Sequence, residues 1–403
     1  MILKKLCFVT REYAHPKMGG TGGIGVFLKH HTKQLYKNGL KITIFSFGKR
    51  AVRFDDNGVS IVKIKDLSAF NDWFKSILRR FKIPGYIRIK MLLEYMNRLY
   101  ISIYLSLFVK KHGFDIIEFH DYGGDAAFFI SSLPMVIRCH GSALSLHKFM
   151  GYYHRKTDSV FEKRLFKRFG SYTIAVSNYS ATITQEAFGL KQKPKVIYNS
   201  VDVPNPKANQ GYLDNPTEPF SIFYFGSIRE RKGIDVACHV FNSILVDYPE
   251  ASFHVMGNNN NNYWNTVAFN LLSDAAKERT TYYGSIPNTE VTNYLGRGHV
   301  FLFPSYGENF SIGLLEVMAL GKITITSNIP AFNEIIQHGI NGFVADSLLD
   351  YCNRISDVFD RRADVEFVSE QAFNTVKNNF NAQFITQQNI DYYQSVITSK
   401  ITP

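Results

Sequence analysis

Residues 300–321 read VFLFPSYGENFSIGLLEVMALG, an apolar run followed by a polar loop and a second apolar segment. The run at 300–303 is typical of a buried strand. The second segment has a helical pattern, with Ser311 as a natural N-cap and Gly321 as a natural stop. A strand that leads through a loop into a helix, repeated along a chain, predicts a parallel sheet with helices on its faces.

Similar units recur on both sides of a polar, proline-containing stretch at 204–219, whose composition is typical of a linker. Strands are expected at 6–10, 41–46, 61–64, 116–119, 135–138, 173–176, 195–198, 220–225, 252–256, 281–283 and 324–326, and one of the helices at 265–277. We therefore predict an α/β protein with two doubly wound, Rossmann-like domains that face each other across a cleft. The domains span 1–203 and 220–380, and residues 381–403 form a C-terminal helix that packs back on the first domain.

The composition of the 403-residue chain, 45% hydrophobic and 20% charged, excludes disordered, collagen-like and fibrous proteins. Its longest nearly apolar stretch, 100–109, is too short for a helix that spans a bilayer. The first residues lack the features of a signal peptide, and the four cysteines form no Cys-x-x-Cys pair. These features predict a cytosolic protein.

Charge is distributed unevenly between the two halves. Residues 1–200 contain 33 Lys and Arg against 13 Asp and Glu, whereas 201–403 contain 13 against 21. Basic and aromatic residues alternate over 73–111 and again over 161–169, which is typical of amphipathic helices at an anionic membrane surface. The alternatives are an ordinary solvated helix face and a nucleic-acid-binding surface, although no nucleic-acid-binding module is recognisable.

A glycine-rich loop at 19–25 follows the first predicted strand and precedes a helix. There the glycines let backbone amides and a helix N-terminus approach a phosphate. Gly20, Gly22 and Gly25 also match the dinucleotide fingerprint literally, which leaves an NAD(P) oxidoreductase as an alternative. The long approach to these glycines and the lack of an acid after the second strand argue against it. A plain flexible loop is the other alternative.

Two further loops carry charged residues at strand-to-helix turns. In the first, Arg229, Arg231 and Lys232 place three cations where they can neutralise a diphosphate, unless the turn is simply solvated. In the second, Glu308 lies in the loop and Glu316 lies about one turn inside the following helix. One carboxylate can bind sugar hydroxyls while the other binds a ribose.

The order of several segments along nearly the whole chain resembles the retaining glycosyltransferases of the GT-B fold, family GT4 (glycosyltransferase group 1). The segments are 22–25, 138–141, 176–177, 198–202, 226–233, 308–316, 318–322 and 334–342. The chain departs from the family pattern at Ser227, where arginine is usual, and at Ser200 and Ser311, where glycine is usual or frequent.

The resemblance implies a role for each matching residue. The Gly23 amide and Lys232 would bind the donor diphosphate, with Arg229 or Arg231 in place of the usual arginine. Glu308 would hold hydroxyls of the transferred sugar, Glu316 the ribose, and His140 would lie at the reaction centre. Donor binding is also expected of Asn309, Phe310, Ser311 and Ile312, and acceptor binding of Gly25 and Asn199.

The cytosolic features and the basic stretches predict a location at the inner face of the membrane, and the resemblance implies an enzyme. It would move a hexose from a nucleotide-diphosphate sugar to a hydroxyl of a glycan or lipid-linked acceptor, with retention, in surface polysaccharide biosynthesis. No metal or other cofactor and no nucleic acid are expected, and the chain contains no Asp-x-Asp motif. A nucleotide-sugar 2-epimerase or a phosphorylase of the same fold, and a basic nucleic-acid-binding protein, are the alternatives.

Overall fold

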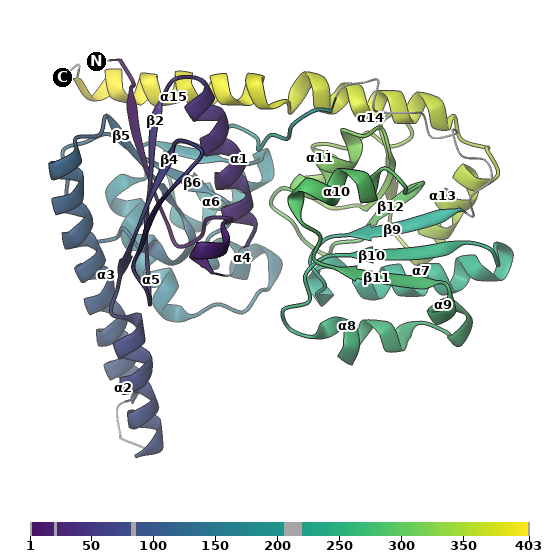
Figure 1. Ribbon diagram of the computed structural model, residues 1–403, viewed down its shortest axis with the longest axis horizontal. Helices are drawn as coiled ribbons and strands as arrows, with labels where there is room; N and C mark the ends of the chain where they lie inside the picture. The colour runs from purple at the N-terminus through teal and green to yellow at the C-terminus, as the bar shows by residue number, and fades with distance from the viewer. Residues whose placement is uncertain (1, 20–21, 82–85, 205–219, 402–403) are drawn as a thin grey trace. The chain divides into compact units, whose positions relative to one another are not determined.

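The computed structural model describes residues 2–19, 22–81, 86–204 and 220–401 (Figure 1). The chain divides into two compact units. Unit 1 contains residues 1–198 and 383–403, and unit 2 contains residues 199–382. Each unit has its own sheet, so the expected α/β class with two parallel-sheet domains is confirmed. The domain boundaries expected from the sequence lay at 203 and 380; of the expected linker, only Pro204 lies inside the described residues.

Unit 1 has an eight-stranded sheet of order β3-β4-β2-β1-β5-β6-β7-β8. The strands are β1 (Lys5–Thr10), β2 (Lys41–Gly48), β3 (Val52–Asp56), β4 (Val59–Lys65), β5 (Ile116–His120), β6 (Met135–Cys139), β7 (Thr173–Ala175) and β8 (Lys195–Val196). All neighbours are parallel except β3 and β4, which form a hairpin. At its turn, Asn57 and Gly58 have φ values of 54° and 90°, the geometry that Asn-Gly turns favour.

The helices of unit 1 pack around this sheet, except α2, which packs against α3. They are α1 (Gly23–Lys37), α2 (Ser68–Arg80), α3 (Tyr86–His112), α4 (Ala143–Met150), α5 (Lys156–Phe169), α6 (Asn178–Phe188) and most of α15 (Ala382–Ile401), with the short 3₁₀ helices η1 (Pro16–Met18) and η2 (Tyr122–Gly124). A buried apolar core joins the strands to α3, α5 and α6 through Phe45, Phe108, Ile137 and Leu165.

The last helix, α15, is tied to the sheet of unit 1 by a buried charge network. Arg138 on β6 is fully buried and donates to Glu118 on β5, with an Nε to Oε1 distance of 2.7 Å. Its Nη2 also donates to Asn389 Oδ1 (2.5 Å) and to Tyr393 Oη (3.0 Å) of α15. Tyr393 in turn donates to Glu118 Oε2 at 2.6 Å. Because a buried ion pair needs additional partners, α15 completes this core rather than merely covering it.

Unit 2 has a six-stranded, fully parallel sheet of order β11-β10-β9-β12-β13-β14. Its strands are β9 (Ser221–Phe225), β10 (Ser252–Met256), β11 (Thr280–Gly284), β12 (Val300–Phe303), β13 (Ile323–Ser327) and β14 (Phe343–Ala345). The helices are η4 (Glu230–Lys232), α7 (Ile234–Asp247), α8 (Tyr263–Thr266), η5 (Ala268–Leu271), α9 (Asp274–Glu278), α10 (Asn288–Leu295), α11 (Ile312–Met318), α12 (Pro330–Asn333), α13 (Leu348–Phe359) and α14 (Val365–Asn379).

The single helix expected at 265–277 is wrong. The segment instead forms α8, η5 and α9, because Val267 leaves the helical region and Ser273 starts a new helix by accepting the Ala276 amide at 3.2 Å.

Replacing Tyr393 with Phe tests the anchoring of α15. The variant leaves Arg138 and Glu118 buried with one partner fewer, so we expect a loss of about 1–3 kcal/mol in the free energy of unfolding, measured by urea denaturation. The control is Tyr392→Phe on the same helix, which removes one bond to the Thr173 carbonyl and has a smaller effect. Equal losses in both variants would contradict the network.

Candidate active site

In unit 2 the strand order reverses between β9 and β12, which lie side by side. Ligands of open α/β sheets bind at such a switch point, beyond the carboxyl ends of the strands. The loop after β9 spans 226–233 and the loop after β12 spans 304–311. Both loops contain residues that the sequence predicts to bind the donor.

The structure brings Lys232 and Glu308 into direct contact. Lys232 Nζ donates to Glu308 Oε1, and Ser305 Oγ donates to the same oxygen at 3.1 Å. Glu308 is only 5% exposed, while the Lys232 side chain is 20% exposed. Two charged residues 76 positions apart in sequence therefore form one pair that solvent reaches from the lysine side.

Gly233 makes this contact sterically feasible. Its φ is +67°, and a Cβ there would lie 1.9 Å from the carbonyl oxygen of Pro304. Tyr224, on β9, donates to the carbonyls of Ser227 (3.1 Å) and Lys232 (3.3 Å). These bonds hold the 226–233 loop against the strand. Neither residue has a role predicted from the sequence, although a glycine directly after a cation at a strand-to-helix turn is a usable signal.

Most of the other predicted donor residues lie in the same two loops and in the start of α11. Ser311 caps α11 by accepting the Leu314 amide at 3.3 Å, so the helix begins at Ile312 as predicted. The Phe310 ring lies 6.0 Å from that of Phe380. The remaining three differ in exposure: Arg229 is exposed, whereas Asn309 and Arg231 are partly buried.

Glu316 lies in α11 with a partly buried side chain, and burial raises the pKa of its carboxyl from 4.5 to about 7. A carboxyl of this kind is poised to ionise near neutral pH and to accept hydrogen bonds from hydroxyls.

In unit 1, His140 directly follows β6 and is held through its backbone. The amides of His140 and Gly141 donate to the two oxygens of Asp121, at 3.1 and 3.0 Å. Burial raises the pKa of Asp121 to about 7 and, as the main cause, lowers that of His140 well below its usual value. His140 is therefore a neutral imidazole, suited to hydrogen bonding and not to charge stabilisation.

Two neighbours of His140 were missed by the sequence analysis. Asp121 follows β5 directly, a position from which acids often reach a site. The His120 ring lies 5.0 Å from that of His140, and neither of its nitrogens has a hydrogen-bond partner among the described residues. Burial lowers the pKa of His120 to about 3.

Gly23 begins α1, as the predicted phosphate-binding amide requires. The preceding amide, of Gly22, donates to Glu12 Oε2 at 3.0 Å, an acid that sequence reasoning did not single out. Gly25 is buried in α1, and its carbonyl accepts the Ala14 amide at 3.2 Å. Gly20, part of the literal dinucleotide fingerprint, lies outside the described residues.

Asn199 belongs to unit 2, unlike Gly25, the other predicted acceptor-binding residue. It is 4% exposed, and its Oδ1 accepts no hydrogen bond from the residues that the structure describes. His140, Gly23 and Gly25 lie in unit 1, and the other predicted site residues lie in unit 2.

The structure changes the interpretation of the basic stretch 73–111. Arg98, one of the basic residues of the predicted amphipathic surface helix, is 4% exposed and donates to the Gly123 carbonyl and to Asp158. None of the helices in the described residues is both long and apolar enough to cross a membrane. Within the same residues, no three His, Cys, Asp or Glu side chains are grouped as metal ligands.

Two family models match the chain, Glycosyltransferase Family 4 over residues 21–204 and Glycosyl transferases group 1 over residues 207–356. The chain belongs to the glycosyltransferase family that these two models describe. It is an enzyme of the hexosyltransferase class.

Curated relatives of this glycosyltransferase are distant. An uncharacterised 41.2 kDa protein of the Klebsiella pneumoniae cps region is 24% identical over 51% of this chain and 56% of its own length, so the chain spans little more than half of that relative. The UDP-Gal:alpha-D-GlcNAc-diphosphoundecaprenol alpha-1,3-galactosyltransferase of Escherichia coli is 24% identical over 83% of this chain and 89% of its own length.

Among solved structures, Anabaena HepE in complex with UDP and glucose superposes with a TM-score of 0.69 at 19% identity, over 97% of this chain and 100% of that chain. This likeness confirms the GT-B fold.

Replacing Gly233 with Ala tests the approach of the two loops. Because the added Cβ meets the Pro304 carbonyl, we expect a loss of more than about 2 kcal/mol in the free energy of unfolding of unit 2. The control is Gly339→Ala, at a φ of +75° with nothing within 4 Å of the new Cβ, which should cost about 1 kcal/mol. Urea denaturation distinguishes the two, and equal losses would mean that the contact is unimportant.

Glu316 predicts a pH dependence of stability. Between pH 4.5 and about 7 the folded chain holds a proton that the unfolded chain releases, so this group's contribution to stability is lost as the pH rises through that window. In Glu316→Gln we expect the free energy of unfolding, measured with urea, to lack this decline. The stability of the variant relative to the wild type should therefore increase from pH 5 to pH 8. The exposed Glu370, changed to Gln, is the control and should follow the wild-type profile; identical profiles for all three proteins would contradict the assignment.

Proposed function

We propose that this glycosyltransferase transfers a hexose, with retention, from a nucleotide-diphosphate sugar to a hydroxyl of a lipid-linked or glycan acceptor in surface polysaccharide biosynthesis. The observation that carries the proposal is the contact between Lys232 and Glu308 at the switch point of unit 2. A cation and a carboxylate are held there side by side by residues of two different loops.

The pair supplies the two kinds of group that a sugar nucleotide requires. Lys232 is partly open to solvent, so it can exchange part of its contact with Glu308 for the donor diphosphate and stabilise the departing charge. Glu308 then accepts hydroxyls of the sugar. Arg229 or Arg231 adds positive charge, Glu316 accepts the ribose hydroxyls, and the amide of Gly23 contacts the diphosphate.

Unit 1 supplies His140 to the reaction. His140 is neutral and held by Asp121, and we assign to it a hydrogen bond to the sugar at the reaction centre. Among the described residues we assign no carboxylate as a covalent nucleophile, and we favour displacement on one face of the sugar, in which the departing phosphate takes the acceptor proton. The chemistry assigned to these residues needs neither a metal nor another cofactor.

The comparisons support the classes of donor and acceptor. The Escherichia coli relative is named for a UDP-galactose donor and a diphosphoundecaprenol acceptor, and HepE was solved with UDP. We extend both features to this chain and propose a UDP-sugar and a lipid-linked acceptor. An acceptor in a bilayer, together with the basic first half of the chain, supports a peripheral position at the cytoplasmic face of the membrane.

Glu308→Gln tests the function. We expect release of nucleoside diphosphate from one of a panel of UDP-, GDP- and dTDP-sugars, increased by a membrane lipid extract, and a loss on the order of 10²-fold in the variant, because its neutral amide binds neither Lys232 nor the sugar as the carboxylate does. NMR of the product anomeric proton then reports retention.

The control is Glu250→Gln, an exposed acid of the same unit paired with Arg279. It should turn over at the wild-type rate, and urea unfolding should show that both variants are folded. Wild-type rates in Glu308→Gln would remove Glu308 from the site, and an inverted product would overturn retention.

A further inference from the structure

Helix α3 packs one apolar face on the core and exposes a second row of large apolar side chains along 91–107. Between Met91 and Leu107 the only charged residues are Glu94 and Arg98, and both are buried. Large apolar side chains on the same stretch are exposed, including Leu92 (57%), Met96 (50%), Ile103 (54%) and Leu107 (66%). A helix at an ordinary protein surface has the opposite distribution, so this face needs an apolar partner.

Helix α5 shows a complementary arrangement of charge. Its acids are buried: Asp158 pairs with Arg98, and Glu162 accepts the amides of Gly123, Ala143 and Leu144. Its exposed face carries the cations Lys156, Lys163, Arg164, Lys167 and Arg168. With the acids inside and the cations outside, α5 presents positive charge next to the apolar face of α3.

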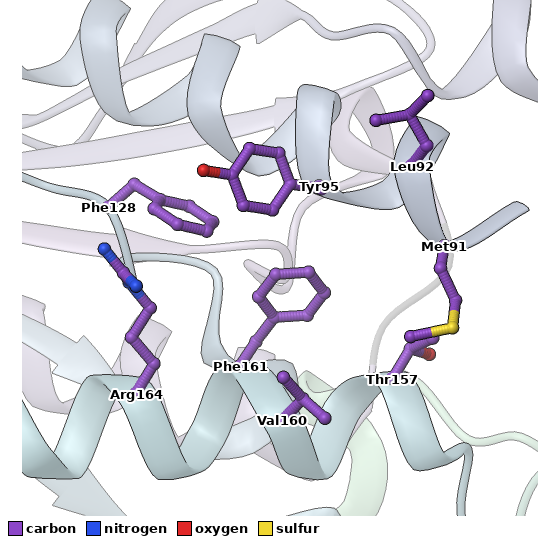
Figure 2. Close-up of a pocket in the computed structure, with 8 residues that line it drawn as sticks. All are labelled: Met91, Leu92, Tyr95, Phe128, Thr157, Val160, Phe161 and Arg164. Atoms are coloured by element: carbon purple, nitrogen blue, oxygen red, sulfur yellow. The ribbon is translucent and has the colours of Figure 1, made fainter. Parts of the chain in front are cut away.

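A groove of about 370 Å³ lies between these two faces, within the range of about 300–1,000 Å³ typical of small-molecule sites. Figure 2 shows its lining, with the Tyr95, Phe128 and Phe161 rings grouped together and the Arg164 guanidinium beside Phe128. The ring centroids of Tyr95 and Phe128 are 4.5 Å apart, and those of Phe128 and Phe161 are 5.8 Å apart.

Arg164 is the cation at the rim of the groove. Its Cζ lies 4.5 Å from the centre of the Phe128 ring, and its Nε donates to the Ala127 carbonyl at 3.2 Å. These contacts fix the plane of the guanidinium, while its terminal nitrogens make no hydrogen bond to any described residue. A fixed guanidinium with open donors is suited to a phosphate.

We propose that this groove holds one hydrocarbon chain of a bilayer lipid and that Arg164 binds the phosphate of the same lipid. The apolar lining and the cationic rim match the two parts of such a molecule. A second copy of the chain fits less well, because it would bring two cationic α5 faces together. The inference deepens the proposed function: it rests on a lipid-linked acceptor and places the tail of a phosphate-bearing lipid on unit 1.

Binding of dodecyl phosphate, below the concentration at which it forms micelles, tests the site in the full chain by calorimetry. We expect one molecule per chain. Val160→Trp fills the groove and should weaken binding about tenfold or more, and Arg164→Gln should weaken it about fivefold by removing the charge. Dodecanol should bind more weakly than dodecyl phosphate, and inorganic phosphate should not compete.

Each variant has a matched control. Ile103 is as exposed as Val160, at 54% against 55%, and lies on α3 outside the groove lining, so Ile103→Trp should bind as the wild type does. Lys167→Gln removes an exposed charge of α5 that does not line the groove and should leave the affinity within about twofold. Urea unfolding shows that all four variants are folded.

Equal affinities of Val160→Trp and Ile103→Trp, or equal binding of dodecanol and dodecyl phosphate, would overturn the proposal. A dimer in light scattering that Val160→Trp dissociates would overturn it too, because the groove would then be an interface between copies. The assay contains no nucleotide sugar, so its outcome is separate from that of the Glu308→Gln experiment: lipid binding without turnover contradicts only the proposed function.

Discussion

Reversal of the strand order beside the first strand of each sheet is the constraint on which the rest of the structure depends. Between β1 and β5 in unit 1, and between β9 and β12 in unit 2, it makes two loops that are distant in sequence neighbours at the carboxyl edge. In both units an ion pair joins such loops: Arg11 pairs with Asp125, and Lys232 pairs with Glu308. The same topology therefore produces a charged contact twice, with different surroundings.

The partners of each carboxylate separate those that build the structure from those that are available for chemistry. Asp121 and Glu162 are enclosed and accept backbone amides, so their charge is used to hold the loops around His140. Glu308 has a lysine partner that solvent reaches, and a ligand can therefore compete for the pair. The distinction lies in what each oxygen contacts, since all three residues are nearly inaccessible to solvent.

Much of the fold and part of the site could be predicted because they depend on local patterns. Apolar runs located most of the parallel strands, and Ser311 set the start of α11. Contacts that depend on steric fit or on a distant partner could not be predicted. In the sequence, Arg98 is one basic residue among several. Its burial becomes evident only from its contact with Asp158, sixty positions away. The close approach of the Pro304 carbonyl to Gly233 is a contact that no spacing along the chain reveals.

The anchoring of α15 has a consequence for the order in which the protein is made. Unit 1 leaves the ribosome first, yet Arg138 and Glu118 lack two of their partners until Asn389 and Tyr393 have been synthesised. The sequence of unit 2 is complete before that point, since it ends at residue 382. All residues of unit 2 are therefore synthesised before unit 1 is complete, and unit 1 keeps an incompletely satisfied charge pair until α15 has been made.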